Sequence, residues 1–231
     1  MKPCHLPALG AALIVWFLHA AQAQAPQASA PLYVVSHIDV LLSAKKAGMN
    51  LLKQFRESCR NESGTQRCEF AQRLEQQNQF VALEIWKDRA AFEAHRAAAA
   101  TSQFHDRLRP MLAGPYDERV YAPVSVLPPQ PLPGGRLTYA VTHIEVLAAR
   151  ANEAAALLTQ MADTGRKATG NVLLEVVRQV DSSNQFSVVS VWTNRRLQDA
   201  FDMTAAMRQF RDKLQPMLGA PYDKRLFKVL D

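Results

Sequence analysis

The chain has 231 residues, which is enough for one large domain or for two domains of about 100 residues each. Its residues are 48% hydrophobic and 21% charged, as is typical of a soluble globular protein. The formal net charge is +6, but the basic residues are scattered among acidic ones. The composition therefore gives no reason to expect a nucleic-acid partner.

The first 23 residues have the pattern of a secretory signal peptide. Lys2 gives a positive start, the apolar run LPALGAALIVWFLHA follows, and Ala21-Gln22-Ala23 forms a small-x-small cleavage site. We expect cleavage after Ala23 or, alternatively, after Ala25, which would leave a periplasmic or secreted protein with no membrane segment. An uncleaved anchor is the alternative, because the apolar run is nearly long enough to span a bilayer.

The periodicity of the next 90 or so residues predicts one compact unit. In chain order we expect a strand over 33–41, a helix over 44–61 stopped by Gly64, a hairpin of strands over 66–75 and 79–86, helices over 88–98 and 101–112, and a strand over 116–122. Asp88 is the expected N-cap of the second helix.

Cys59 and Cys68 lie nine positions apart within this unit. Once Cys4 leaves with the signal peptide, they are an even pair in a protein expected to reach an oxidising compartment, so we predict a disulfide. A metal site is not expected, because no CxxC motif or histidine cluster accompanies them.

The second half of the chain repeats the first at an offset of 106 residues without a gap. NQFVALEIW (78–86) aligns with NQFSVVSVW (184–192), and 31 of 89 aligned positions are identical. We therefore predict one domain over 32–122, a semi-rigid Pro/Gly linker over 123–136 and a second domain over 137–230.

The predicted order within each copy is β-α-β-β-α-β, the split βαβ arrangement of ferredoxin-like α+β domains. Helices would cover one face of each sheet. Both faces of the first strand are largely apolar, with Val34 and Ile38 on one side and Tyr33 and Val35 on the other. The second face must then be covered too, so we expect the sheets of the two copies to face each other as an intramolecular dimeric α/β barrel.

The segments EIWKDRAAFEAH (84–95) and QFHDRLRPML (103–112) resemble the antibiotic biosynthesis monooxygenase family. Members typically have a strand that ends in Glu-x-Trp, then a helix with Ala-Phe-x-x-His, then a phenylalanine in an apolar helix end. The first copy fits this pattern through Glu84, Trp86, Phe92 and His95. The second copy keeps Trp192 but departs from the pattern at Ser190, Gln198 and Phe201.

The resemblance implies cofactor-independent oxygenation of a small quinol or phenol by O2, with no flavin or metal. The resemblance also implies homodimers, whose place the internal pseudo-dimer would take. A homo-oligomer of that pseudo-dimer stays open. Some relatives bind or degrade haem instead. A neutral histidine is a suitable base for deprotonating a phenol, because its pKa lies near working pH.

The expected pocket lies in the first copy, with His37 or His95 as the base and Trp86 as a wall or hydrogen-bond donor. Its other expected substrate contacts are Phe92, Phe104 and Glu69.

Each candidate also has a structural interpretation. His37 has a twin at His143, which duplication of a packing residue explains as well as catalysis does. His95 could be a partly exposed helix residue, Trp86 a core residue, and Glu69, like its match Glu175, a solvent-facing strand acid. Two alternatives to the enzyme stay open: a non-enzymatic periplasmic ligand-binding or stress-related module, and haem binding or degradation.

Overall fold

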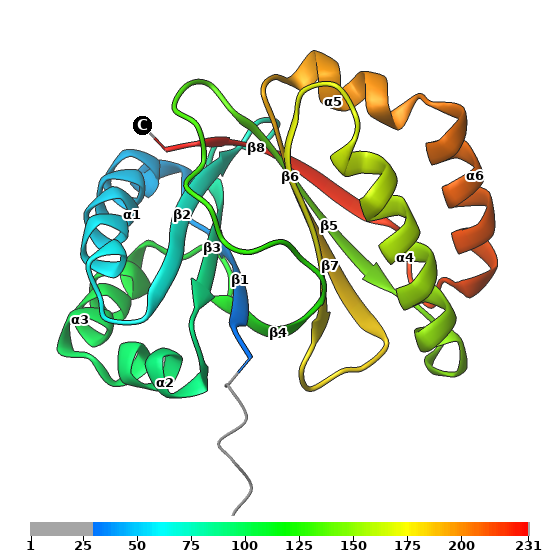
Figure 1. Ribbon diagram of the computed structural model, residues 1–231. Coiled ribbons are helices and arrows are strands. Elements are labelled where there is room, and N and C mark those ends of the chain that lie inside the picture. Colours follow the sequence, from blue (N-terminus) through cyan, green and yellow to red (C-terminus); the bar gives the residue numbers. More distant parts are fainter. Residues whose placement is uncertain (1–29, 231) are drawn as a thin grey trace, which may run out of the picture.

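The computed structural model describes residues 30–230, so the predicted signal peptide lies outside the described residues. In the part of the chain that is described, no helix is both long and apolar enough to cross a bilayer. The chain forms two α+β units that follow one another and share one order of elements (Figure 1). The predicted fold class is confirmed.

Within the described residues each copy contributes four strands and three α-helices, together with two 3-10 helices of three residues each. The first copy contains β1 (Leu32–Asp39), α1 (Lys45–Arg60), β2 (Thr65–Arg73), β3 (Gln79–Trp86), α2 (Arg89–Ala97), α3 (Ala99–Leu108) and β4 (Asp117–Ser125). The second contains β5 (Thr138–Glu145), α4 (Ala151–Arg166), β6 (Asn171–Gln179), β7 (Gln185–Trp192), α5 (Arg195–Asp202), α6 (Ala205–Leu214) and β8 (Asp223–Val229).

Side-chain caps fix where the short middle helices begin. The Asp88 carboxylate accepts a hydrogen bond from the backbone N–H of Ala91 at 2.7 Å, so the predicted N-cap of α2 is confirmed. Asn194 does the same for α5 through the N–H of Leu197 at 3.0 Å. The two copies therefore keep the same cap chemistry although the residue itself has changed.

The eight strands close into a single antiparallel barrel in the order β1-β3-β2-β8-β5-β7-β6-β4. Two pairings join the copies, β2 with β8 and β4 with β6. β4 continues to Ser125, into the segment predicted as linker, because its end pairs with β6 through Pro123 and Val177. Closure leaves no edge of either sheet unpaired by another strand, which removes sites for aggregation.

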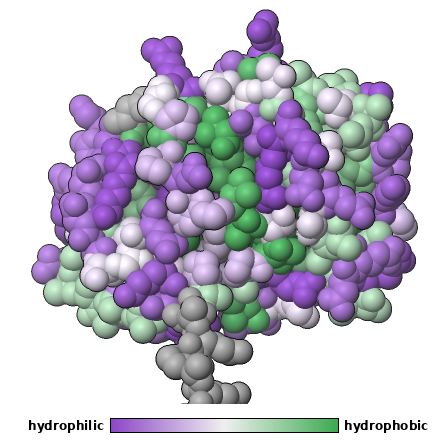
Figure 2. Space-filling model, in the orientation of Figure 1, coloured by the Kyte–Doolittle hydropathy of each residue, from purple (hydrophilic) through white to green (hydrophobic). Residues whose placement is uncertain are grey.

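Three apolar clusters fill the molecule. One lies between the sheet and helices of the first copy, one lies at the same place in the second copy, and one fills the barrel interior. The helices of the two copies flank the barrel on opposite sides (Figure 1). Apolar residues gather in a strip between these helical layers on the face drawn in Figure 2.

Alternation along β1 decides which cluster each side chain joins. Tyr33 and Val35 belong to the barrel interior, whereas Val34 and Ile38 pack under the helices. The side chains of β1 therefore divide between the helix–sheet layer and the barrel interior.

Candidate active site

The first copy buries a histidine between its helices and the outer face of its sheet. His95 on α2 is 5% exposed, so the interpretation of a partly exposed helix residue is wrong. Its Nδ1 lies 2.8 Å from a carboxylate oxygen of Glu62, and its ring stacks on Trp86 with ring centres 4.5 Å apart. A hydrogen bond from Nδ1–H to Glu62 leaves Nε2 free to accept a proton.

A second acid completes this cluster on the other side of the ring. Glu84 on β3 is 4% exposed and accepts a hydrogen bond from the Trp86 indole N–H at 2.9 Å. Its carboxylate oxygen lies 3.9 Å from His95 Nε2. Burial raises the pKa of Glu84, although the nearby charge of His95 and the Trp86 hydrogen bond work in the opposite direction.

Aromatic side chains surround this group. Phe104 stacks on Phe55 with ring centres 3.9 Å apart, and Phe55 in turn lies 5.7 Å from the His95 ring. Phe92 is buried in the same cluster. The structure therefore brings together four of the residues chosen from the sequence: Trp86, Phe92, His95 and Phe104.

His37 lies elsewhere, because neighbouring residues of a strand point to opposite faces. It lines a cavity of about 430 Å³ at one end of the barrel, together with His143, Arg119 and Arg225. Burial and then the charge of Arg225 lower the pKa of His37 to about 4. A single active site that uses both His37 and His95 is therefore excluded.

The barrel-end cavity repeats the internal duplication. The Arg119 guanidinium is held by Asp117 at 2.7 Å, and Arg225 is held by Asp223 at the matching position. Arg119 also lies 3.3 Å from a ring nitrogen of His143 on β5, across the junction between the copies. Each arginine thus already has a carboxylate partner.

Glu69 does not belong to the cluster around Trp86. It lies on β2, where its two carboxylate oxygens accept hydrogen bonds from Arg60 at 2.7 Å, and it lines a separate surface cavity with the linker. Its match Glu175 is not solvent-facing, as the sequence had suggested, but buried and paired with Arg67 at 2.8 Å. Burial raises the pKa of Glu175, and Arg67 opposes that effect.

The corresponding place in the second copy has no histidine. Phe201 stands where the first copy has His95, Ala168 where it has Glu62, and Ser190 where it has Glu84. The Trp192 indole N–H donates to the Ser190 hydroxyl at 3.0 Å, which retains the tryptophan contact without the acid. Among residues 30–230, only the first copy therefore places a histidine and a buried glutamate against this tryptophan.

The possible metal ligands of this layer are Cys59, Cys68 and Glu84, whose ligand atoms lie within 4.8 Å of one another. The two sulfur atoms form a disulfide with a Cα–Cα distance of 6.1 Å, so neither is a thiolate in this state. The disulfide instead ties the end of α1 to β2 directly beneath Glu84.

Comparison with known proteins agrees with this architecture. Residues 31–107 and 138–213 each match the antibiotic biosynthesis monooxygenase family, which together is well over half of the chain. The chain belongs to this family. Membership of this family supports a general monooxygenase-type function, with a small molecule as the substrate. A search of curated proteins found no match.

Solved structures share the tandem arrangement. A candidate monooxygenase from Fusobacterium nucleatum subsp. nucleatum superposes with a TM-score of 0.79 at 14% identity, over 89% of this chain and 94% of its own. A candidate monooxygenase from Lactobacillus acidophilus NCFM gives 0.72 at 12% identity, over 88% and 95%. An anthrone oxidase-like protein gives 0.68 at 10% identity, over 86% and 91%. At these identities the likeness shows the fold alone.

Glu62 is the residue of this site that the sequence analysis missed. It lies in the loop after α1, 33 positions before His95, and no local motif connects the two. One signal was present, since the second copy lacks both members of the pair. This signal was weak, because 58 of the 89 aligned positions differ between the copies.

Proposed function

We propose that the protein is a cofactor-independent monooxygenase that oxygenates a small quinol or phenol with O2, and that its active site is the helix–sheet layer of the first copy. The observation that carries this proposal is the buried Glu62–His95 pair stacked against Trp86. An acid that holds one nitrogen of a histidine orients the other for proton transfer, as in many catalytic dyads.

In this mechanism His95 Nε2 takes the proton of a substrate hydroxyl. The resulting anion is electron-rich enough to reduce O2, so the substrate itself supplies all the electrons. For a quinol, one oxygen atom forms a new C–O bond on the ring and the other leaves as water, so that quinol and O2 give a hydroxyquinone and H2O. The aromatic walls exclude bulk water from the anion.

His95 is a better base than His37 on physical grounds. The pKa of His37 is lowered to about 4 by burial and by Arg225, so its affinity for a proton near neutral pH is weak. Within the described part of the chain no carboxylate is hydrogen-bonded to the His37 ring, whereas Glu62 lies 2.8 Å from His95 Nδ1 and orients that ring.

Oxygen uptake with a panel of substituted hydroquinones tests the proposal. His95→Ala should reduce the enzymatic rate about 100-fold or more, the usual contribution of a general base. His105→Ala is a matched control, because His105 belongs to the same helical layer but lies against Tyr116, with ring centres 4.9 Å apart. Rates equal to buffer, or equal rates for wild type and His95→Ala, would reject the proposal.

One observation favours a second function, a ligand-binding module without catalysis. A cavity of about 430 Å³ lies at the barrel end, lined by His37, His143, Arg119 and Arg225, and offers room for a ligand away from the Glu62–His95 pair. A major regulator of staphylococcal pathogenesis superposes with a TM-score of 0.57 at 10% identity, so the fold also occurs in a protein described as a regulator. Native mass spectrometry that shows a retained ligand with no turnover would support this function, and a Soret titration with haemin tests the haem alternative separately.

A further inference from the structure

The Cys59–Cys68 disulfide of the first copy lies beside a buried carboxylate. The two sulfur atoms and a carboxylate oxygen of Glu84 lie within 4.8 Å of one another, and all three residues are at most 4% exposed. Among residues 30–230, no lysine or arginine forms an ion pair with Glu84. Reduction of the disulfide would therefore leave two thiols and a carboxylate together in one buried space, with no lysine or arginine to offset their negative charge.

These three groups supply donor atoms that zinc prefers. Thiolate ligands select Zn²⁺ over Mg²⁺ and Ca²⁺, which prefer oxygen ligands alone. In a tetrahedral zinc site the Zn–S bonds are about 2.3 Å and the Zn–O bonds about 2.0–2.2 Å long, so the ligand atoms lie about 3–4 Å apart. The spacing of the three groups approaches this geometry. Water takes the fourth position in zinc sites that have three protein ligands.

The protein holds these groups in place without the sulfur–sulfur bond. The Trp86 indole N–H donates to a Glu84 carboxylate oxygen at 2.9 Å, and carboxylates that bind metals are typically oriented by such a hydrogen bond. The backbone carbonyl groups of both cysteines accept side-chain hydrogen bonds, from Thr65 at 2.8 Å and from Arg60 at 3.1 Å. The two cysteines therefore stay next to Glu84 when their disulfide is reduced.

A surface cavity gives a reductant and a metal ion a route to this cluster. Its volume is about 260 Å³, and Cys68 lines it together with Pro129, Pro131 and Leu132 of the linker. A metal site needs such an entry path as well as suitable ligands. A thiol reductant attacks the sulfur atom that it can reach, so we expect the disulfide to open first at Cys68.

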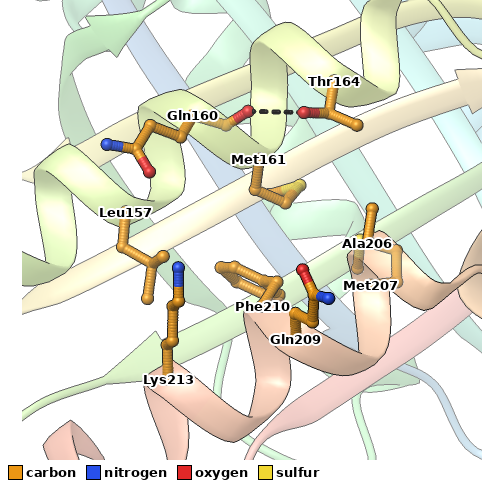
Figure 3. Close-up of a pocket in the computed structure, with 9 residues that line it drawn as sticks. All are labelled: Leu157, Gln160, Met161, Thr164, Ala206, Met207, Gln209, Phe210 and Lys213. Atoms are coloured by element: carbon orange, nitrogen blue, oxygen red, sulfur yellow. Dashed lines mark hydrogen bonds between the residues drawn. The ribbon is translucent and has the colours of Figure 1, made fainter.

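The second copy lacks the three donor groups at the matching place. The positions of Cys59, Cys68 and Glu84 are taken there by Gly165, Leu174 and Ser190. A Cβ on Gly165 would lie 2.3 Å from the Leu174 side chain, so these positions also converge in the second copy. Thr164, next to Gly165, borders the groove between α4 and α6, and none of the residues drawn there has a thiol, an imidazole or a carboxylate (Figure 3). Within the described chain, the donor set therefore comes together in the first copy alone.

We propose that reduction of the Cys59–Cys68 disulfide converts this cluster into a zinc site, in which the two thiolates and a Glu84 carboxylate oxygen bind one Zn²⁺. A dithiol reductant supplies two electrons and two protons to the sulfur atoms and is itself oxidised to a disulfide. Zn²⁺ then displaces both thiol protons into solvent. This inference goes beyond the proposed activity of the first copy, because it requires neither His95 nor O2.

Titration with Co²⁺, a spectroscopic substitute for Zn²⁺, tests this site. The full chain with Cys4→Ser, in which Cys59 and Cys68 are the remaining cysteines, is reduced with a phosphine, which takes an oxygen atom from water and becomes a phosphine oxide. Under argon, one Co²⁺ per chain should bind with thiolate-to-cobalt charge-transfer absorption, and Zn²⁺ should displace it. The unreduced protein should show no such absorption. Absence of this absorption in protein with two titrated free thiols, or equal absorption without reduction, would overturn the proposal.

Variants test whether Glu84 is a ligand. Trp86→Phe removes the indole N–H that orients Glu84 and should weaken Co²⁺ binding about 10–100-fold, the usual effect of losing such a partner. Trp192→Phe is the matched control, because Trp192 donates to Ser190 in the second copy at 3.0 Å, and it should leave the affinity unchanged. Glu84→Gln should weaken binding at least as much as Trp86→Phe. Equal affinities of wild type and Glu84→Gln, with two free thiols in each, would contradict coordination by this carboxylate.

His95→Ala separates this site from the proposed oxygenation. The cobalt titration contains no quinol, whereas oxygen uptake is measured on the disulfide-bonded protein. His95→Ala should therefore keep the cobalt absorption after reduction and lose oxygen uptake before it, so that failure of either proposal leaves the other testable. Loss of the cobalt absorption in His95→Ala, with two free thiols present, would contradict a site built from the two cysteines and Glu84.

Discussion

Loss of the buried Arg67–Glu175 ion pair should destabilise the protein far more than loss of the more exposed Arg60–Glu69 ion pair. Arg67 on β2 and Glu175 on β6 come from different copies, and their side chains are 7% and 2% exposed. Glu175→Gln leaves the Arg67 charge buried without a counterion, which typically costs about 3–5 kcal/mol of unfolding free energy.

The matched control is Glu69→Gln, because Glu69 and Glu175 occupy the same position in the two copies. The partner of Glu69, Arg60, has a side chain that is 38% exposed, so this pair should contribute less than about 1 kcal/mol. Replacing both interior charges, as Arg67→Met with Glu175→Leu, should recover most of the loss, because buried ion pairs are often no better than apolar contacts.

Urea unfolding followed by circular dichroism measures all four free energies. The reasoning predicts a large loss for Glu175→Gln, a small loss for Glu69→Gln and a double variant within about 1–2 kcal/mol of wild type. Equal losses for the two glutamine variants would refute it, since burial would then not decide the strength of the pair.

Three further predictions concern stability. Folding lowers the pKa of His37 from 6.5 to about 4, so the stability that its neutral form contributes is fully present above pH 6.5 and falls by about 3 kcal/mol towards pH 4. The free energy of unfolding, measured from pH 7 to pH 4, should therefore fall more steeply for wild type than for His37→Gln. Parallel curves for the two proteins would contradict this prediction. Replacing both cysteines of the Cys59–Cys68 disulfide by alanine should lower the free energy of unfolding in urea by about 2–3 kcal/mol. Reductant should not change the stability of this variant, and a loss below about 1 kcal/mol would count against a stabilising disulfide. Gly170 has φ +79°, and a Cβ at this position would lie 2.4 Å from a side-chain atom of Leu197. Gly170→Ala should therefore lower the melting temperature more than Gly114→Ala, whose Cβ would meet nothing within 4 Å. Equal melting temperatures of the two variants would be inconsistent with this strain.

The sequence predicted the fold because its evidence was local and repeated. Alternation along residues 33–40 identified a buried strand, and the gap-free repeat showed that every element occurs twice. The cap at Asp88 was equally predictable, since an N-cap bonds to a residue three positions away.

The long-range relations could not be read in the same way. Glu175 and Glu69 look alike in the sequence, but in the closed barrel Glu175 is buried beside Arg67, whereas Glu69 pairs with the more exposed Arg60. His37 and His95 were equally attractive bases until the two faces of β1 separated them. Glu62 reaches His95 from a loop whose path depends on the packing of α1 against β2, which no local pattern specifies.

Mass spectrometry of the product formed under ¹⁸O2 tests the central claim most directly. The protein should convert a hydroquinone to a hydroxyquinone that carries one ¹⁸O atom, with the second ¹⁸O in water, and His95→Ala should give none above the buffer rate. An unlabelled quinone, or labelled product formed equally well by His95→Ala, would contradict a monooxygenase that uses His95 in the first copy.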